Sequence, residues 1–137
     1  MKKIGIVVSE FNREISKQML RECLRGFREL KISPIVLKVP GAVEMPYAVQ
    51  EMILKKKVAA VVALGAVIKG ETDHYERVCE MCSSGLAALS LKYRIPVIFE
   101  VLMCDTVSKA NKRVDKAYEA AYLALKMINL KYESTKS

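Results

Sequence analysis

Hydrophobic residues along this chain alternate between short continuous runs and segments where they recur every three or four positions. Continuous apolar runs are typical of strands buried on both faces, and the wider spacing is typical of helices packed on one side. Asn12 is expected as the N-cap of the first helix, and Pro46 in the first turn of the second. The predicted strands are residues 4–9, 35–39, 58–68 and 96–103, and the predicted helices are 13–30, 45–56, 73–93 and 107–130, the last broken near Arg113.

The regular alternation of strand and helix predicts the architecture. Parallel strands joined by helical crossovers need helices on both faces of the sheet. We therefore expect residues 1–137 to form a single α/β domain, a three-layer αβα sandwich around a four-stranded parallel sheet. In such sheets ligands bind beyond the carboxyl ends of the strands.

The stretch from Val58 to Glu76 has the strongest functional signal. Its apolar run ends at Lys69-Gly70, and a polar loop then leads to His74, the only histidine in the chain. Backbone N–H groups in such a loop and at the following helix start can bind a phosphate or an oxyanion. We therefore expect an anion site here, with a titratable ring beside it.

Composition narrows the class of protein. A hydrophobic fraction of 52% and a mean hydropathy of +0.14 exclude a disordered chain and suggest that neighbouring subunits cover some apolar surface. The longest apolar run is shorter than the roughly 20 residues that a membrane span needs. The first residues lack the pattern of a signal peptide, so we expect a cytoplasmic protein with no membrane segment.

Part of the formal net charge of +8 forms a helical stripe of Arg13, Lys17, Arg21 and Arg25. Such a stripe can mark a nucleic-acid-binding surface. The glutamates mixed into it favour a solvated helix face, so nucleic acid is not an expected partner. An anionic substrate would also use some of this charge.

Two of the four cysteines, Cys79 and Cys82, form a C-x-x-C pair. The pair lies inside a predicted helix, whereas a redox pair is expected at a helix start. A zinc site would need two further ligands. Helix packing is therefore the favoured interpretation.

Four segments follow the predicted strands: Phe11-Asn12, Pro40-Gly41-Ala42-Val43-Glu44-Met45-Pro46, Gly70-Glu71-Thr72-Asp73-His74, and Asp105-Thr106 with Arg113 eight residues on. With these motifs the chain resembles the lumazine synthase family over nearly its whole length. The resemblance implies a flavodoxin-like fold and the condensation of a ribitylamino-pyrimidinedione with 3,4-dihydroxy-2-butanone 4-phosphate. It also implies homopentamers, alone or closed into an icosahedral shell, with active sites between neighbouring subunits and no cofactor or metal.

The resemblance also implies roles for individual residues. Phe11 would stack on the pyrimidinedione, and Glu44 would accept hydrogen bonds from the ribityl hydroxyls. His74 would carry protons, because histidine has a reference pKa of about 6.5 and can both give and take a proton near neutrality. The other implied substrate contacts are Ala42, Val43, Ala66, Val67, Ile68 and Phe99, and the implied phosphate ligands are Gly70, Glu71, Thr72 and Arg113.

Two alternatives stay open beside a lumazine synthase. One is the archaeal-type riboflavin synthase of related fold, which dismutates the lumazine product. The other is a non-catalytic flavin-binding or shell-forming homologue. The SEFN and GETDHYE segments favour the synthase, although Glu100 stands where the family usually has glycine and Met103-Cys104 replaces its Thr-rich turn.

Overall fold

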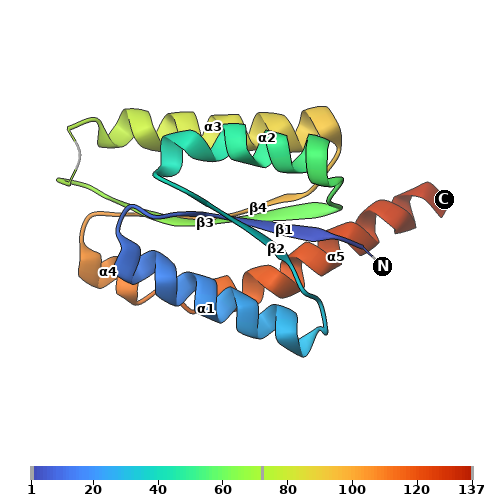
Figure 1. Ribbon diagram of the computed structural model, residues 1–137. Helices are drawn as coiled ribbons and strands as arrows, with labels where there is room; N and C mark the ends of the chain where they lie inside the picture. Colours follow the sequence, from blue (N-terminus) through green and yellow to red (C-terminus); the bar gives the residue numbers. More distant parts are fainter. Residues whose placement is uncertain (1, 72, 137) are drawn as a thin grey trace.

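The four strands pair into one parallel sheet with the order β2-β1-β3-β4 (Figure 1). The computed structural model describes residues 2–71 and 73–136. Each strand is hydrogen-bonded in parallel to its neighbours, as the βαβ alternation predicts. The strands are β1 (Ile4–Ser9), β2 (Ile35–Val39), β3 (Ala60–Ile68) and β4 (Val97–Cys104).

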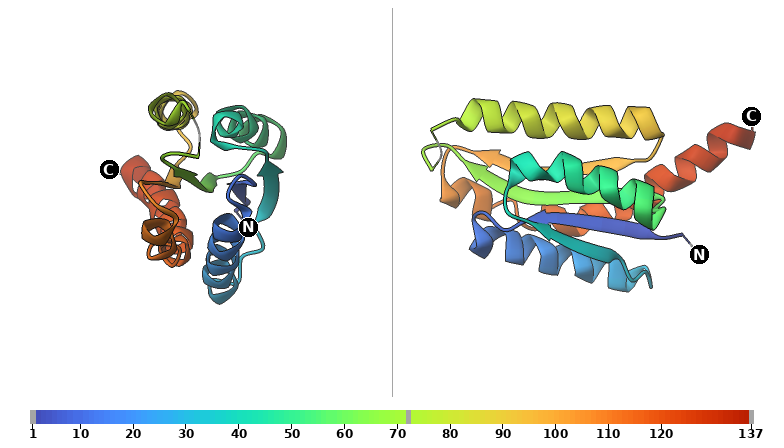
Figure 2. Two further views of the ribbon diagram at one scale, coloured as in Figure 1. Left: turned by 90° about the vertical axis from the view of Figure 1, so that its left-hand side faces the viewer. Right: turned by 45° about the horizontal axis from the view of Figure 1, so that its top comes forward.

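Helices cover both faces of the sheet. α2 and α3 lie on one face, and α1, α4 and α5 lie on the other, which the end-on view in Figure 2 shows as three layers. The predicted flavodoxin-like αβα sandwich is therefore confirmed. The helices are α1 (Arg13–Glu29), α2 (Met45–Lys56), α3 (Tyr75–Tyr93), α4 (Val107–Asn111) and α5 (Lys116–Lys136), with a short 3-10 turn, η1 (Ala42–Glu44), before α2.

The core lies in two layers, one on each side of the sheet. β3 is buried at every position because β1 and β4 flank it and helices cover both its faces. Alternate residues enter opposite layers, so Val62 packs toward α1 and α5 while Val61 packs toward α2 and α3. This arrangement explains why the strand reads as one continuous apolar run.

Several predicted boundaries differ from the structure by one or two residues, and the two-residue shifts are at the starts of β3 and α3. β3 begins at Ala60 rather than at residue 58 because the ladder with β1 starts at the Ile4–Ala60 pair. α3 begins at Tyr75 rather than at residue 73 because His74 occupies its N-cap position.

α5 continues past the predicted end at residue 130 because its last turns contact two other segments. The Lys131 ammonium donates to the Arg94 carbonyl at 2.8 Å, just after α3. The Lys2 ammonium lies 3.8 Å from the centre of the Tyr132 ring. Both partners are distant in sequence, so the local pattern could not indicate this extension (Figure 1).

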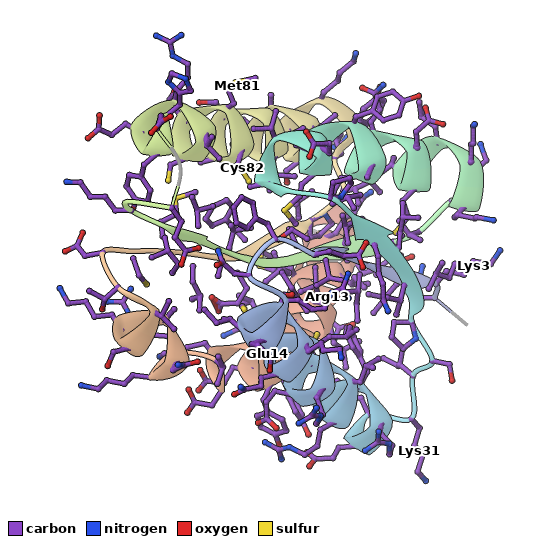
Figure 3. The ribbon with its side chains drawn as sticks, turned by 60° about the vertical axis from the view of Figure 1, so that its left-hand side comes forward. Lys3, Arg13, Glu14, Lys31, Met81 and Cys82 are labelled. Atoms are coloured by element: carbon purple, nitrogen blue, oxygen red, sulfur yellow. The ribbon has the colours of Figure 1, made fainter. Side chains whose placement is uncertain are left out.

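The basic stripe on α1 is an exposed helix face with its own acidic partners. Arg25 pairs with Glu22 at 2.8 Å, and Arg13 lies 3.5 Å from Glu10. Figure 3 shows Arg13 and Glu14 together at the start of this helix. The interpretation as a solvated face agrees with these contacts.

α2 and α3 approach each other closely at Gly85. A Cβ atom at this position would lie 2.7 Å from Pro46 Cγ and 2.9 Å from Pro46 Cβ. We expect Gly85→Ala to lower the free energy of unfolding by about 1–3 kcal/mol, because overpacking outweighs the better helix propensity of alanine. Urea unfolding measures this difference. Ser84→Ala, on the exposed side of the same turn, is the control and should change stability much less; equal losses in the two variants would contradict the packing argument.

Glu100 is a half-buried carboxylate on the edge strand β4. Loss of water around it raises its pKa above the usual carboxyl value, and the negative charge of Glu119 adds to the rise. The positive charge of Lys116 opposes the shift only in part. The charged form of Glu100 is therefore less favourable in the folded chain than in the unfolded chain.

This raised pKa predicts a pH-dependent stability. Below the unfolded carboxyl pKa, about 4.3, Glu100 is protonated in both states. As the pH rises from the unfolded pKa to the raised folded pKa, the unfolded chain releases its proton while the folded chain still retains it, so stability falls and the loss is complete above the folded pKa. Glu100→Gln should therefore raise the free energy of unfolding at neutral pH and leave it unchanged at about pH 4. Urea unfolding at one protein concentration across this pH range checks the prediction, and an equal effect at every pH would contradict it.

Candidate active site

A small cavity of about 180 Å³ opens at the carboxyl ends of β1, β2 and β3 because these strands end at different levels. Pairing of β1 with β3 stops at Val8–Leu64, while β3 continues along β4 to the Ile68–Cys104 pair. The last residues of β3 therefore have a strand on one side only. We call this space the strand-end cavity; it is lined by Phe11, Asn12, Gly41, Ala42, Val43, Glu44, Ala66, Val67, Ile68, Glu71 and Val78.

The strand-end cavity brings together most of the predicted substrate contacts. Phe11, the segment 42–44 and the segment 66–68 come from three different strand ends and meet here. The predicted substrate contacts did not include Asn12, Gly41 or Val78, which also line this cavity. An extra Cβ at Gly41 would lie 3.2 Å from the Glu44 carboxylate, and Val78 reaches the cavity one turn into α3.

Phe11 is held at the mouth of the strand-end cavity by its backbone. Its N–H donates to the Pro40 carbonyl at 3.0 Å, and the Glu10 N–H donates to the Val39 carbonyl at 2.7 Å. The side chain is 50% exposed, so Phe11 is not a core aromatic. A half-exposed ring on an anchored backbone offers a flat apolar surface to a ligand.

Asn12 occupies the N-cap position of α1, as predicted. Its backbone is left-handed, with φ 59° and ψ 52°, and the side chain makes no capping hydrogen bond. The Asn12 Nδ2 group instead donates to the Ala66 carbonyl at 2.9 Å. This bond crosses from the end of β1 to the unpaired edge of β3.

Glu44 lies at the start of α2 without capping it. Its side chain makes no hydrogen bond to the first turn, and the carboxylate lies beside Gly41 instead. The residue is exposed and lines the strand-end cavity. Its oxygens are therefore available as hydrogen-bond acceptors for a ligand.

The loop after β3 turns sharply, and two of its amides already have partners. The Lys69 N–H donates to the Cys104 carbonyl at 2.9 Å, and the Glu71 N–H donates to the Ile68 carbonyl at 3.2 Å. Gly70 adopts φ +95°, a conformation that favours glycine. Thr72, a predicted phosphate ligand, lies outside the described residues.

His74 lies on an open hollow of about 700 Å³. The His74 carbonyl accepts the Val78 N–H at 2.9 Å, and the residue is exposed. Ile68 lines the strand-end cavity and the next residue, Lys69, lines the hollow, so both spaces lie at the carboxyl end of β3. We call the second space the loop hollow; its lining is Lys69, Gly70, Asp73, His74, Tyr75, Glu76, Arg77, Glu80 and Met81.

Phe99 lies apart from the other predicted substrate contacts. It is on the edge strand β4, 40% exposed, and lines a groove with Leu91 and other residues of α3. β3 separates this groove from β1 and the Phe11 loop. Within one chain, therefore, Phe99 does not line the strand-end cavity among the residues described.

Arg113 lies in the turn between α4 and α5, close to the end of β4. Its Nη1 atom is 3.9 Å from the Cys104 sulfur, and the carbonyl of the same cysteine accepts the Lys69 N–H. Cys104 thus connects Arg113 with Lys69, at the start of the loop after β3. The guanidinium is exposed, and in the described part of the chain it lines neither the strand-end cavity nor the loop hollow.

The Cys79–Cys82 pair contributes to packing, as predicted. Cys82 is fully buried under α3, while the neighbouring Met81 lies on the outer side of the helix (Figure 3). Burial raises the pKa of Cys82 to about 11 and also raises the pKa of Cys79, so both remain thiols near neutrality. Across residues 2–71 and 73–136, no three His, Cys, Asp or Glu side chains gather as metal ligands would.

The family model described as 6,7-dimethyl-8-ribityllumazine synthase matches residues 1–132. A relative with that name from Kosmotoga olearia is 43% identical over 137 aligned positions, which cover 94% of this chain and 88% of the relative. Another, from Coxiella burnetii, is 40% identical over 139 positions, covering 96% and 92%. The similarity therefore spans all the strand ends that form the strand-end cavity and the loop hollow.

Proposed function

The chain belongs to the 6,7-dimethyl-8-ribityllumazine synthase family, and we infer from this that it forms lumazine in riboflavin biosynthesis. The reaction condenses 5-amino-6-(D-ribitylamino)uracil with 3,4-dihydroxy-2-butanone 4-phosphate and releases phosphate. One observation supports this function above the others: a half-exposed aromatic ring, a free carboxylate and a strand edge meet beside the loop that carries His74.

We place the pyrimidinedione in the strand-end cavity. Its ring would stack on Phe11, its ribityl hydroxyls would donate to the Glu44 carboxylate, and its edge would face the backbone of residues 66–68. The ketose phosphate would lie in the loop hollow, where the backbone of the Gly70 loop, the Lys69 ammonium and the α3 N-terminus favour an anion.

His74 is the proton carrier in this arrangement. The pyrimidinedione amine attacks the ketone carbonyl and water leaves, which gives an imine; phosphate is then eliminated, and the second amine attacks the remaining carbonyl and closes the ring with loss of a second water. Each of these steps needs a proton moved to or from nitrogen or oxygen. His74 lies in the loop hollow with Lys69 and Gly70, just after the β3 residues that line the strand-end cavity, so we place the reacting carbons at this end of β3.

We propose that neighbouring subunits complete the site in a homopentameric ring. Ligand sites usually have volumes of about 300–1,000 Å³. The strand-end cavity is smaller than this, so within one subunit it forms only part of a complete ligand site. The two sheet edges are unlike: Leu37 and Tyr47 are exposed at the β2 side, and Leu91 and Phe99 at the β4 side. Contact between unlike faces generates rings. The β4 side of one subunit would then bring Phe99 and Arg113 to the next subunit's cavity.

Mixing two variants that are each nearly inactive at low concentrations of the ketone phosphate tests this shared site. His74→Ala changes the cavity-bearing side, and Arg113→Ala changes the side offered to a neighbour. In mixed rings about one quarter of the interfaces would combine an intact His74 with an intact Arg113, and activity should return accordingly. If both residues act in the same chain, the mixture stays inactive. Native mass spectrometry of the parent measures whether the ring is a pentamer or a larger shell.

We also propose a cytoplasmic location. All four cysteines are free thiols, which is typical of a reducing compartment. No helix of the described chain is long and apolar enough to cross a membrane. Fractionation of the native cells with an antibody against this chain would test the proposal.

Assays with both substrates, and then with lumazine alone, separate the proposed function from its alternatives. We expect lumazine to form from the two substrates and lumazine alone to remain unchanged. Dismutation of lumazine alone would indicate a riboflavin synthase. Tight flavin binding with no turnover in either assay would indicate a non-catalytic homologue.

Phe11→Ala should weaken the binding of the pyrimidinedione and of flavin-like ligands by about 1–3 kcal/mol, by analogy with base stacking on aromatic side chains. Phe11→Trp is the matched control because it keeps a flat aromatic surface at the mouth of the strand-end cavity. Calorimetric titration measures both affinities. Equal binding by the alanine variant and the parent would show that the ring does not stack on the ligand.

A further inference from the structure

We propose that Asn12 is a positioning residue that sets Phe11 over the strand-end cavity through its bond to Ala66. The inference rests on the proposed function, because it assigns Phe11 to the pyrimidinedione. It concerns how the stacking surface is placed before the substrate arrives.

Three hydrogen bonds among the described residues attach the loop that carries Phe11 to the neighbouring strand ends. Two of them, from the N–H groups of Glu10 and Phe11, go to the carbonyls of Val39 and Pro40 at the end of β2. The third reaches β3, where the Asn12 Nδ2 group donates to the Ala66 carbonyl at 2.9 Å. Without this bond the loop would keep its contacts with β2 and its continuity with β1 and α1, but it would lose its direct attachment to the part of β3 that lines the cavity.

The Ala66 carbonyl needs such a partner. Its residue is buried, and the last paired residues of β1 and β3 are Val8 and Leu64, two positions earlier. A buried carbonyl without a donor is costly, so the bond to Asn12 replaces the one that a longer β1 would have made.

The residue type at position 12 meets two requirements at once. The backbone is left-handed at φ 59°, a region that glycine, asparagine and aspartate enter most readily. Of these three, only asparagine has a side-chain N–H that can donate to a carbonyl. Glycine would keep the backbone and lose the bond, whereas aspartate would place a second acceptor against the Ala66 oxygen.

The consequence is a pre-organised site. A ring that is already in place loses less freedom when a ligand stacks on it, and affinity improves accordingly. Loss of the Asn12 bond should therefore weaken binding of the pyrimidinedione. Binding of the phosphate-bearing substrate should change little, because that substrate is assigned to the loop hollow. The change should appear in the KM of the pyrimidinedione rather than in kcat.

The test compares Asn12→Gly and Asn12→Asp with the parent in binding of riboflavin, a ligand with the same ribityl chain, and in steady-state kinetics. We expect about three- to tenfold weaker binding in both variants, the factor that one lost hydrogen bond produces. Lys57→Gly is the matched control, since Lys57 is also left-handed, at φ 56°, and ends α2 away from both hollows. It should bind riboflavin as the parent does.

A double-mutant cycle with Phe11→Ala shows whether Asn12 acts through the ring. If it does, Asn12→Gly has no further effect on affinity once the ring is absent. An undiminished effect in that background would mean that Asn12 contacts the ligand directly and would overturn the positioning role. The positioning role would also be overturned if the Asn12 variants unfold at a lower temperature than the parent but bind riboflavin as tightly. The parent protein could also bind riboflavin, and the double-mutant cycle could give the expected result, while no lumazine is formed. That outcome would overturn the proposed function and leave the positioning role of Asn12 intact.

Discussion

Replacing His74 with alanine is expected to slow turnover at saturating substrates by about 100- to 10,000-fold, the usual contribution of general acid–base catalysis. The dissociation constants of both substrates should change little. His74 is the only histidine in the chain, and it lies in the loop hollow at the start of α3. Formation of the imine, loss of phosphate and ring closure all need a group that gives and takes protons near neutrality.

Glu76→Gln is the matched control for this prediction. It removes another titratable side chain from the loop hollow, in the first turn of the same helix. Its turnover should stay close to that of the parent. The measured rates must be corrected for the uncatalysed condensation of these reactive substrates. Unchanged turnover in His74→Ala after this correction would mean that His74 is a structural residue.

Arg113→Ala is expected to raise the KM of the phosphorylated ketone by about 100-fold and to weaken inhibition by inorganic phosphate in parallel. Hydrogen bonds to charged groups contribute about 1.5–3 kcal/mol each, and a guanidinium can offer two in one fork. The loop can replace them only in part, because the Lys69 and Glu71 amides already donate to the Cys104 and Ile68 carbonyls. Binding of the pyrimidinedione should change little.

Two further variants make the Arg113 prediction specific. Arg113→Lys keeps the charge without the fork and should have an intermediate effect. Lys112→Ala removes a positive charge from the adjacent exposed position and should leave both constants near those of the parent. If Arg113→Ala instead binds the ketone phosphate normally and loses the pyrimidinedione, our placement of the two substrates is reversed.

The sequence by itself determined the order of strands and helices and the residues at the strand ends. Both follow from local physics, because a strand buried on two faces must be apolar throughout and a loop at a strand end must be polar or contain glycine. The run from Ala60 to Ile68 followed by Gly70 is the clearest case. From parallel strands it also follows that these ends share one edge of the sheet.

Only the tertiary structure decided which strand-end residues meet. The strand-end cavity exists because the β1 ladder ends at Leu64 while β3 continues to Ile68, a difference in level that depends on strand register. Asn12 reads as a helix cap locally, yet its partner is Ala66, 54 residues away. Phe99 follows the same apolar pattern as its neighbours, yet the strand order puts it on the far side of β3 from Phe11. Contacts between residues distant in sequence depend on how the layers pack, and local spacing does not specify that packing.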